Sequence, residues 1–130
     1  MIIAKLLILL ALFSPIDREK PKKPVYPPHY MEFIKIAKCE QPSRNGGGWH
    51  GIAWHQNYNH SFSGGMGMTT QNWSDFKRKG QPTQMSRATP VEQLWSAYRL
   101  YVWAEKTYPG NGESAWVCSS MVGFKGLPKH

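Results

Sequence analysis

Residues 29–40 read HYMEFIKIAKCE, and the spacing of this stretch decides how the rest of the chain is interpreted. Apolar side chains recur at positions 30, 33, 34 and 37, which is the pattern of one buried face of an α-helix. Glu40 comes three residues after the last of them and falls on the same face. Pro42 and a run of glycines follow, so we expect the helix to end at this point.

Glu40 is the first candidate for a functional residue. A carboxylate on the inward side of a helix's last turn is unfavourable when ionised, because burial and the negative end of the helix dipole both favour the protonated form. No basic partner stands nearby in the sequence. Glu40 is therefore either a polar residue that ends the helix or a carboxyl kept for acid chemistry.

The N-terminal part of the chain does not belong to a folded core. Residues 2–13 read IIAKLLILLALF, which is shorter than the roughly 20 apolar residues of a membrane span. The segment is typical of a secretory signal, although the small-residue cleavage pattern is missing. We expect residues 1–14 to be a signal peptide or a short membrane-associated anchor, the alternative being a buried terminal helix. The prolines and lysines of residues 15–28 indicate an extended linker.

The two cysteines, Cys39 and Cys118, stand at opposite ends of the predicted domain, residues 29–120. In an exported protein such a pair favours a disulfide, and closing a loop this long stabilises a small domain by about 4 kcal/mol. The alternative is two separate buried thiols. The net charge of +8 suits an anionic polymer or surface. Nucleic acid fits this charge but not export, so we expect no nucleic-acid partner.

Two further helices are predicted in the domain. Thr69 or Thr70 caps the first, which has Trp73 and Phe76 facing inward and ends at Gly80. The second begins with TPVE at residues 89–92, a capping box with proline at the first helical position, and ends before residues 109–110. Its predicted apolar stripe consists of Val91, Leu94, Trp95, Tyr98, Tyr101 and Val102. Residues 41–67 predict irregular chain with short strands, and residues 121–130 a flexible tail.

Other kinds of site are poorly supported. His50, His55 and His60 recur every fifth residue, but no cysteine or acid lies among them, so we expect no metal site and no cofactor. Asp75 is the nearest acid downstream of Glu40, and its helical spacing places it at the surface. No glycine-flanked serine and no phosphate-loop signature occur.

Four pieces of the sequence, in order, resemble one known family. They are IAKCE, GGMGMTTQNW, TPVEQ and AWVC, and together they span residues 30 to 120. They are similar to the transglycosylase-like domain of resuscitation-promoting factors. The resemblance implies a small lysozyme-like fold of the α+β class, mainly helical, that cleaves the glycan strands of peptidoglycan.

The resemblance also implies roles for particular residues. Glu40 matches the catalytic glutamate, and Cys39 and Cys118 match the family's disulfide. Gly64, Gly65 and Trp73 match the segment that borders the substrate groove, and Glu92 and Gln93 match the start of a helix. This chain departs from the family at Gly67, where glutamine is usual, and at Met68, where an aromatic is usual. Sugar stacking on Trp49, Trp54 and Phe62 is our own hypothesis, because aromatics in glycine-rich loops are either core residues or sugar platforms.

We therefore expect a monomeric, secreted or cell-surface enzyme that cleaves the β-1,4 bonds between N-acetylmuramic acid and N-acetylglucosamine. Hydrolysis normally needs a second carboxylate, whereas in lytic transglycosylation the 6-hydroxyl of the muramic acid attacks instead. A single well-placed carboxylate favours transglycosylation. Such an enzyme serves a cell that remodels its own wall or a phage that breaches one. The alternatives are a non-catalytic wall-binding module and a basic domain that acts on membranes or nucleic acid.

Overall fold

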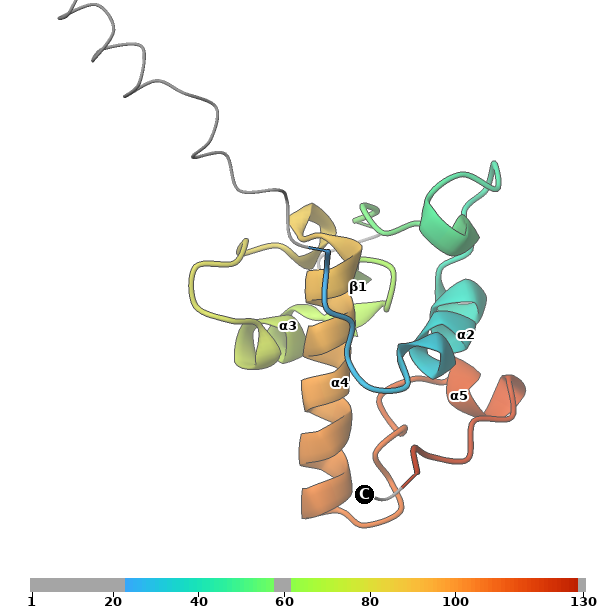
Figure 1. Ribbon diagram of the computed structural model, residues 1–130, viewed down its shortest axis with the longest axis vertical. Coiled ribbons are helices and arrows are strands. Elements are labelled where there is room, and N and C mark those ends of the chain that lie inside the picture. Colours follow the sequence, from blue (N-terminus) through green and yellow to red (C-terminus); the bar gives the residue numbers. More distant parts are fainter. Residues whose placement is uncertain (1–22, 58–61, 129–130) are drawn as a thin grey trace, which may run out of the picture.

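The computed structural model describes residues 23–57 and 62–128 of the chain. The described part is a mixed fold of four α-helices, a two-stranded antiparallel sheet and one disulfide (Figure 1). The expected class, α+β and mainly helical with one disulfide, is confirmed at this level. The elements are α2 (Tyr30–Glu40), η2 (Trp49–Gly51), β1 (Phe62–Ser63), β2 (Met68–Thr69), α3 (Thr70–Phe76), η3 (Met85–Arg87), α4 (Pro90–Thr107) and α5 (Cys118–Met121).

Helix α4 is the central element of the fold. Helix α3 packs on one side of it, and α2 and α5 lie on the other (Figure 1). The predicted capping box is present, since the Thr89 hydroxyl accepts from the Glu92 amide at 3.2 Å and the Glu92 carboxylate accepts from the Thr89 amide at 2.9 Å. The helix continues to Thr107, as the following Pro-Gly pair indicated.

The buried face of α4 differs from the predicted stripe. Leu94 and Tyr101 are buried as predicted, but Val102 is 43% exposed, and Val91, Trp95 and Tyr98 are only half-buried. The neighbouring helices instead meet a face made largely of small and polar side chains: Gln93, Leu94, Ser96, Ala97, Leu100, Tyr101 and Ala104. Alanine and serine let helices approach closely, but they add little to an apolar pattern, so the sequence predicted a face rotated away from the real one.

Helices α2 and α3 follow their sequence signals in most respects. Phe33, Ile34 and Ala37 are buried on α2, as the spacing predicted. Phe33 sits among the aromatic rings of Tyr98, Tyr101, Trp116 and Phe124. The Thr69 hydroxyl caps α3 by accepting from the Asn72 amide, but the helix ends at Phe76 and not at Gly80.

Both ends of the described chain pack onto the domain. In the segment predicted as linker, Pro27 is fully buried, and the ring centroids of Tyr26 and Tyr30 stack at 4.4 Å. The Val25 carbonyl accepts a hydrogen bond from the Trp95 indole. The predicted tail is likewise held, because Phe124 is only 8% exposed and lies in the core. The predicted linker and tail therefore each contribute residues to the domain.

The predicted signal or anchor, residues 1–14, and residues 15–22 of the predicted linker lie outside the described residues. None of the helices that the structure describes has both the length and the apolar composition needed to cross a membrane.

Candidate functional site

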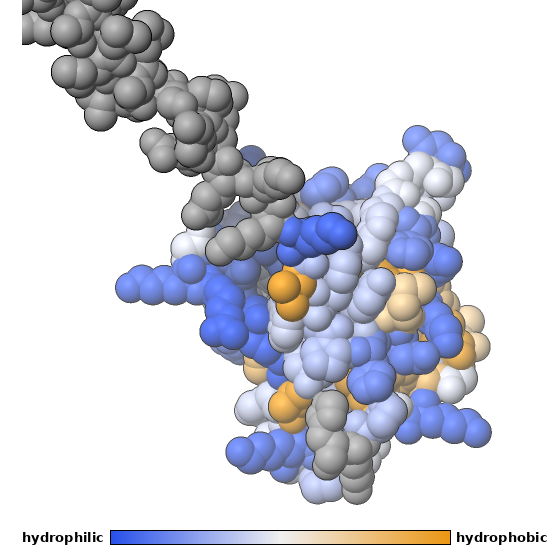
Figure 2. Space-filling model, in the orientation of Figure 1, coloured by the Kyte–Doolittle hydropathy of each residue, from blue (hydrophilic) through white to orange (hydrophobic). Residues whose placement is uncertain are grey.

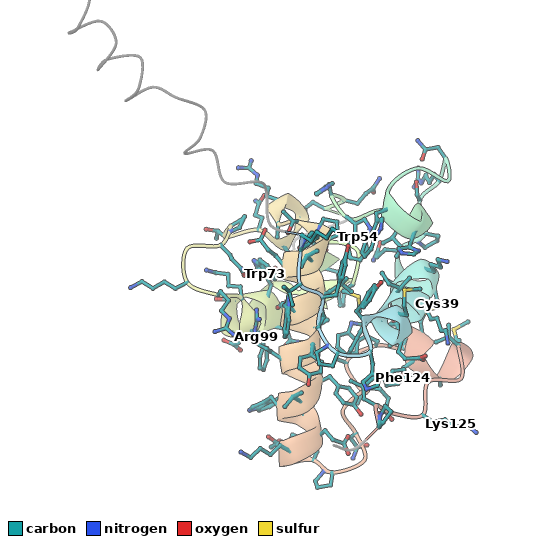
Figure 3. All side chains as sticks on the ribbon, in the orientation of Figure 1. Cys39, Trp54, Trp73, Arg99, Phe124 and Lys125 are labelled. Carbon is teal, nitrogen blue, oxygen red and sulfur yellow. A yellow bond between two sulfur atoms is a disulfide. The ribbon has the colours of Figure 1, made fainter. Side chains whose placement is uncertain are left out.

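Glu40 is the last residue of α2, and its carboxyl is fixed against α5. Oε1 accepts a hydrogen bond of 2.9 Å from the backbone amide of Cys118. Cys39, the residue before Glu40 in α2, forms a disulfide with Cys118, the first residue of α5, with a Cα–Cα distance of 5.8 Å (Figure 3). The predicted disulfide is thus confirmed. Within residues 23–57 and 62–128, Oε2 of the half-buried Glu40 has no hydrogen-bond partner.

An open hollow of about 390 Å³ lies along the chain that follows Glu40. The Ala53 amide donates to the Gln41 carbonyl at 2.9 Å, so one lining residue is paired with the residue after α2, whereas Glu40 itself is not part of the lining. Neutral polar side chains and glycine backbone make most of its lining: Ser43, Asn45, Gly47, Gly48, Ile52, Ala53, Trp54, His55 and Gln56. Such a surface offers hydrogen bonds without charge, which suits an uncharged polar ligand.

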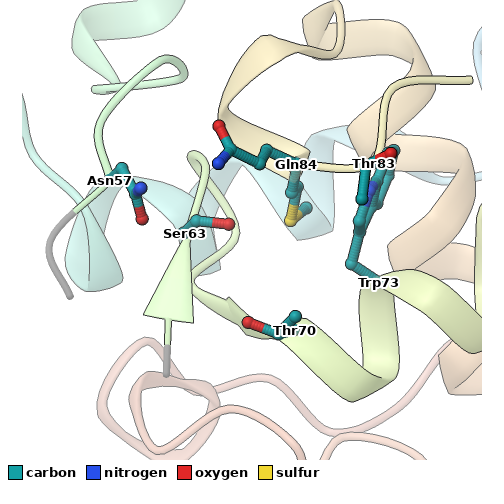
Figure 4. A pocket seen from close by; sticks show the side chains of 7 residues that line it. Asn57, Ser63, Thr70, Trp73, Thr83 and Gln84 are labelled. Atoms are coloured by element: carbon teal, nitrogen blue, oxygen red, sulfur yellow. The ribbon is translucent and has the colours of Figure 1, made fainter. Parts of the chain in front are cut away.

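A second hollow, of about 260 Å³, continues from this segment. Gln56 lines the first hollow and Asn57 lines the second. Asn57 and Ser63 stand on one side, Trp73 and Thr83 on the other, with Gln84 and Thr70 between them (Figure 4). These side chains come from four separate stretches of chain, and their types carry no sequence signal that predicts the site.

Gln93 is a buried residue whose role the sequence did not reveal. Its Oε1 accepts from the Gly65 amide at 2.8 Å, and its Nε2 lies 2.9 to 3.1 Å from the carbonyls of Trp54, Met85 and Ala88. Gln93 therefore joins α4 to the turn between β1 and β2, to Trp54 of the first hollow and to Met85 of the second. The sequence assigned Glu92 and Gln93 to the start of the helix, where both lie, but it did not predict the side-chain bonds of Gln93.

The glycine pair of this turn is explained by close packing. A Cβ atom at Gly65 would lie 2.4 Å from the Trp54 ring, and one at Gly64 would lie 2.6 Å from Oε1 of Gln93. Gly64 and Gly65 are buried, so their place beside the hollows is structural. At Gly67, where φ is +57°, a Cβ atom would lie 3.1 Å from Nε2 of Gln41. The side chain of Gln41 therefore packs close to Gly67.

The predicted aromatic residues have different environments. Trp73 is 1% exposed and Trp54 is 3% exposed, so both belong to the core, although each is also among the residues that line a hollow. Phe62 is 46% exposed on β1. Trp49 is half-buried and stacks on Tyr26 at 5.6 Å. Of the two uses that the sequence left open for Trp49, Trp54 and Phe62, burial assigns Trp54 to the core, whereas Trp49 and Phe62 keep part of their surface exposed.

The remaining candidates lie apart from Glu40. His55 bonds the Ser86 carbonyl at 2.9 Å through Nδ1, and His60 lies outside the described residues. In the part of the chain that the structure describes, no three His, Cys, Asp or Glu side chains gather as a metal site would require. Asp75 is exposed, as predicted. The other described carboxylates are placed elsewhere: Glu32 with Lys35, Asp75 with Gln71, Glu92 in the α4 cap, Glu105 with the amides of Gly110 and Gly112, and Glu113 near Tyr101.

Comparison of the chain with protein-family models, with curated proteins and with solved structures gives no match.

Proposed function

We propose that this protein cleaves the glycan strands of peptidoglycan by lytic transglycosylation, on a small lysozyme-like fold, with Glu40 as the general acid and base. The proposal rests on the sequence resemblance and on the geometry around Glu40. Export agrees with the disulfide, because disulfides persist in oxidising compartments. In this proposal residues 1–14 direct the chain out of the cell.

The observation that carries the proposal is the anchored carboxyl of Glu40. One oxygen is held by the Cys118 amide, the neighbouring Cys39 is covalently tied to α5, and the other oxygen has no partner in the described part of the chain. A catalytic acid needs such support, because its free oxygen must be held in one orientation toward the bond that breaks.

The reaction requires one carboxyl group in two successive roles. Oε2 of Glu40 donates a proton to the glycosidic oxygen as the bond to the anomeric carbon breaks and the muramic sugar gains oxocarbenium character. The 6-hydroxyl of that sugar then attacks the anomeric carbon, and its proton returns to Glu40. The product is a 1,6-anhydromuramic end, and the acid is regenerated. This route suits a site in which Glu40 has no second carboxylate beside it.

The two hollows are the proposed place for the sugar rings. Serine, threonine, asparagine and glutamine side chains line them, and these groups both donate to and accept from sugar hydroxyls. The rings of Trp49 and Phe62 are the partly exposed aromatics for stacking. The glycan would then extend from Glu40 along residues 43–57 toward Thr83 and Gln84.

A second function, wall binding without cleavage, is favoured by one observation. Oε1 of Glu40 already accepts a hydrogen bond from Cys118, and this bond alone gives the residue a role in joining α2 to α5. In that case the hollows bind glycan while Glu40 takes no part in chemistry.

Two assays on the oxidised full chain separate these functions. The enzyme is expected to reduce the turbidity of a wall suspension, and Glu40→Gln is expected to lose this activity at least 100-fold, in line with the usual contribution of a general acid. Asp75→Asn, which changes an exposed carboxylate in the same way, is expected to keep it. Sedimentation with insoluble peptidoglycan reports binding. If the wild type and Glu40→Gln both sediment with the wall and neither reduces its turbidity, the protein binds the wall without cleaving it.

A further inference from the structure

Two arginines face a small hollow on the α3 side of the molecule, away from Glu40. Arg99 extends from α4 toward α3, and Arg78 belongs to the basic run at residues 77–79 that follows α3 (Figure 3). Hydrophilic side chains gather over this part of the surface (Figure 2). The hollow has a volume of about 210 Å³ and is lined by Arg78, Gln81, Val91, Glu92, Trp95 and Arg99.

The guanidinium of Arg99 is fixed but incompletely bonded. Its Nε donates to the Phe76 carbonyl at 2.6 Å, which sets the plane of the group. Its Nη2 is shielded by surrounding atoms and has no hydrogen-bond partner in the described part of the chain. An unpartnered buried donor is unfavourable, so a ligand that supplies an acceptor in the hollow lined by Arg99 would satisfy bonding capacity that the protein leaves unused.

The charges around Arg99 also favour an anion. Burial lowers the pKa of Arg99, and the positive charge of Arg78 lowers it further. Within the described residues neither arginine forms an ion pair. Glu92 lines the same hollow, but its Oε1 accepts from the Thr89 amide in the cap of α4. Two guanidinium groups and one carboxylate leave the lining with one net positive charge.

We propose that this hollow binds a phosphodiester group. A phosphodiester carries a single negative charge, which matches the net charge of the lining, whereas a phosphate monoester carries close to two and would be repelled by Glu92. Arginine is suited to phosphate oxygens because its planar group donates two parallel hydrogen bonds. The Trp95 ring supplies an apolar flank for the carbon atoms attached to the phosphate.

The source of the phosphodiester follows from the proposed function. A wall-cleaving protein meets phosphodiester polymers of glycerol in the walls on which it acts, so we assign the group to such a polymer. This choice of source rests on the proposed function, whereas binding of the phosphodiester itself does not. The two are distinguishable, because the test below measures binding at a site separate from Glu40 and requires no cleavage.

The test is an NMR titration of the oxidised full chain with dimethyl phosphate, at constant ionic strength, that follows the indole N–H of Trp95 and the Nε–H of Arg99. We expect saturable shifts of both signals. Arg78→Gln should weaken the affinity at least fivefold and Arg99→Gln should abolish binding, whereas Lys79→Gln, a nearby exposed charge outside the lining, should change it less than 1.5-fold. If Arg99→Gln fails to fold, Arg78→Gln decides, because Arg78 is exposed.

Three outcomes would overturn the proposal. They are the absence of saturable shifts, equal weakening by Arg78→Gln and Lys79→Gln, and binding of acetate or inorganic phosphate as tight as that of dimethyl phosphate. Competition by poly(glycerol phosphate) would support the assigned source. Competition by single-stranded DNA or by phosphatidylglycerol vesicles, without competition by poly(glycerol phosphate), would refute it.

Discussion

Among single side chains, Gln93 holds together the chain around the two hollows described above, which together form the candidate groove. Its amide bonds four backbone groups, including the Gly65 amide and the Trp54 carbonyl, and it is fully buried. Gln93→Ala would leave these groups without partners, and each buried unpaired group costs about 1–3 kcal/mol. We therefore expect a loss of unfolding free energy of about 3 kcal/mol or more, measured by urea denaturation.

The control for this prediction is Gln71→Ala, which removes an exposed glutamine paired only with Asp75. It should change the free energy of unfolding by no more than about 0.5 kcal/mol. Equal stability of the two variants would mean that the hydrogen bonds of Gln93 are replaced by water and that the groove walls do not depend on it.

At the scale of elements, the start of α4 is the clearest case of local sequence fixing local structure. Thr89 and Glu92 satisfy each other's backbone amides, and Pro90 occupies the first position of the helix. Thr89→Ala removes one side of this exchange and should lower stability by about 1 kcal/mol, which shifts Tm by about 4–8 °C in a domain of this size. Thr107→Ala, at the exposed end of the same helix, should leave the Tm measured by circular dichroism almost unchanged.

The disulfide links two elements that are 79 residues apart in the chain. Removing the link frees a long loop in the unfolded state, and the chain-entropy relation predicts a loss of about 4 kcal/mol. We expect the reduced protein to unfold at lower urea and to lose wall-clearing activity, because α5 no longer holds Glu40. A reduced protein with full stability and full activity would contradict this role. The double variant Cys39→Ser/Cys118→Ser should match the reduced protein and be insensitive to reductant.

The boundaries and faces of elements show what the sequence predicted and what it did not. The ends of α2 and α4 carry proline, glycine and capping residues, so both helices were predictable. The stop of α3 at Phe76 was not, because the lysines and arginine that follow are good helix formers and only tertiary packing diverts them. The inward face of α4 was missed because Ala97 and Ala104 mark it by small size, which an apolar pattern does not register.

At the scale of the whole molecule, the chain before α2 is part of the domain. Tyr26 stacks on both Tyr30 and Trp49, whereas Val25 is 74% exposed. Tyr26→Ala should therefore lower the free energy of unfolding by about 1–2 kcal/mol, from lost area and lost ring stacking. Val25→Ala, one residue earlier, should leave stability almost unchanged. Thermal denaturation of both variants and the wild type measures the two effects. Similar stability of both variants would show that residues 25–28 do not stabilise the domain.

The candidate site was predictable in part, and the reason lies in sequence distance. Glu40 and Cys39 stand together in one helix with clear spacing, so the position of Glu40 at the end of α2 and the disulfide beside it were predictable. Thr83 and Gln84 line the second hollow from another segment, and the buried Gln93 bonds the chain beside it. No local sequence pattern predicts these roles. Trp54 was proposed as a sugar platform together with Trp49 and Phe62, because the sequence does not separate a buried ring from an exposed one.

The measurement that tests the central claim most directly is mass spectrometry of peptidoglycan digested by the oxidised protein, with Glu40→Gln and Asp75→Asn in parallel. The account predicts fragments with 1,6-anhydromuramic ends from the wild type and from Asp75→Asn, and their loss with Glu40→Gln. Reducing ends in place of anhydro ends would contradict transglycosylation. The same products from the wild type and Glu40→Gln, or no products from any of the three proteins, would contradict the role assigned to Glu40.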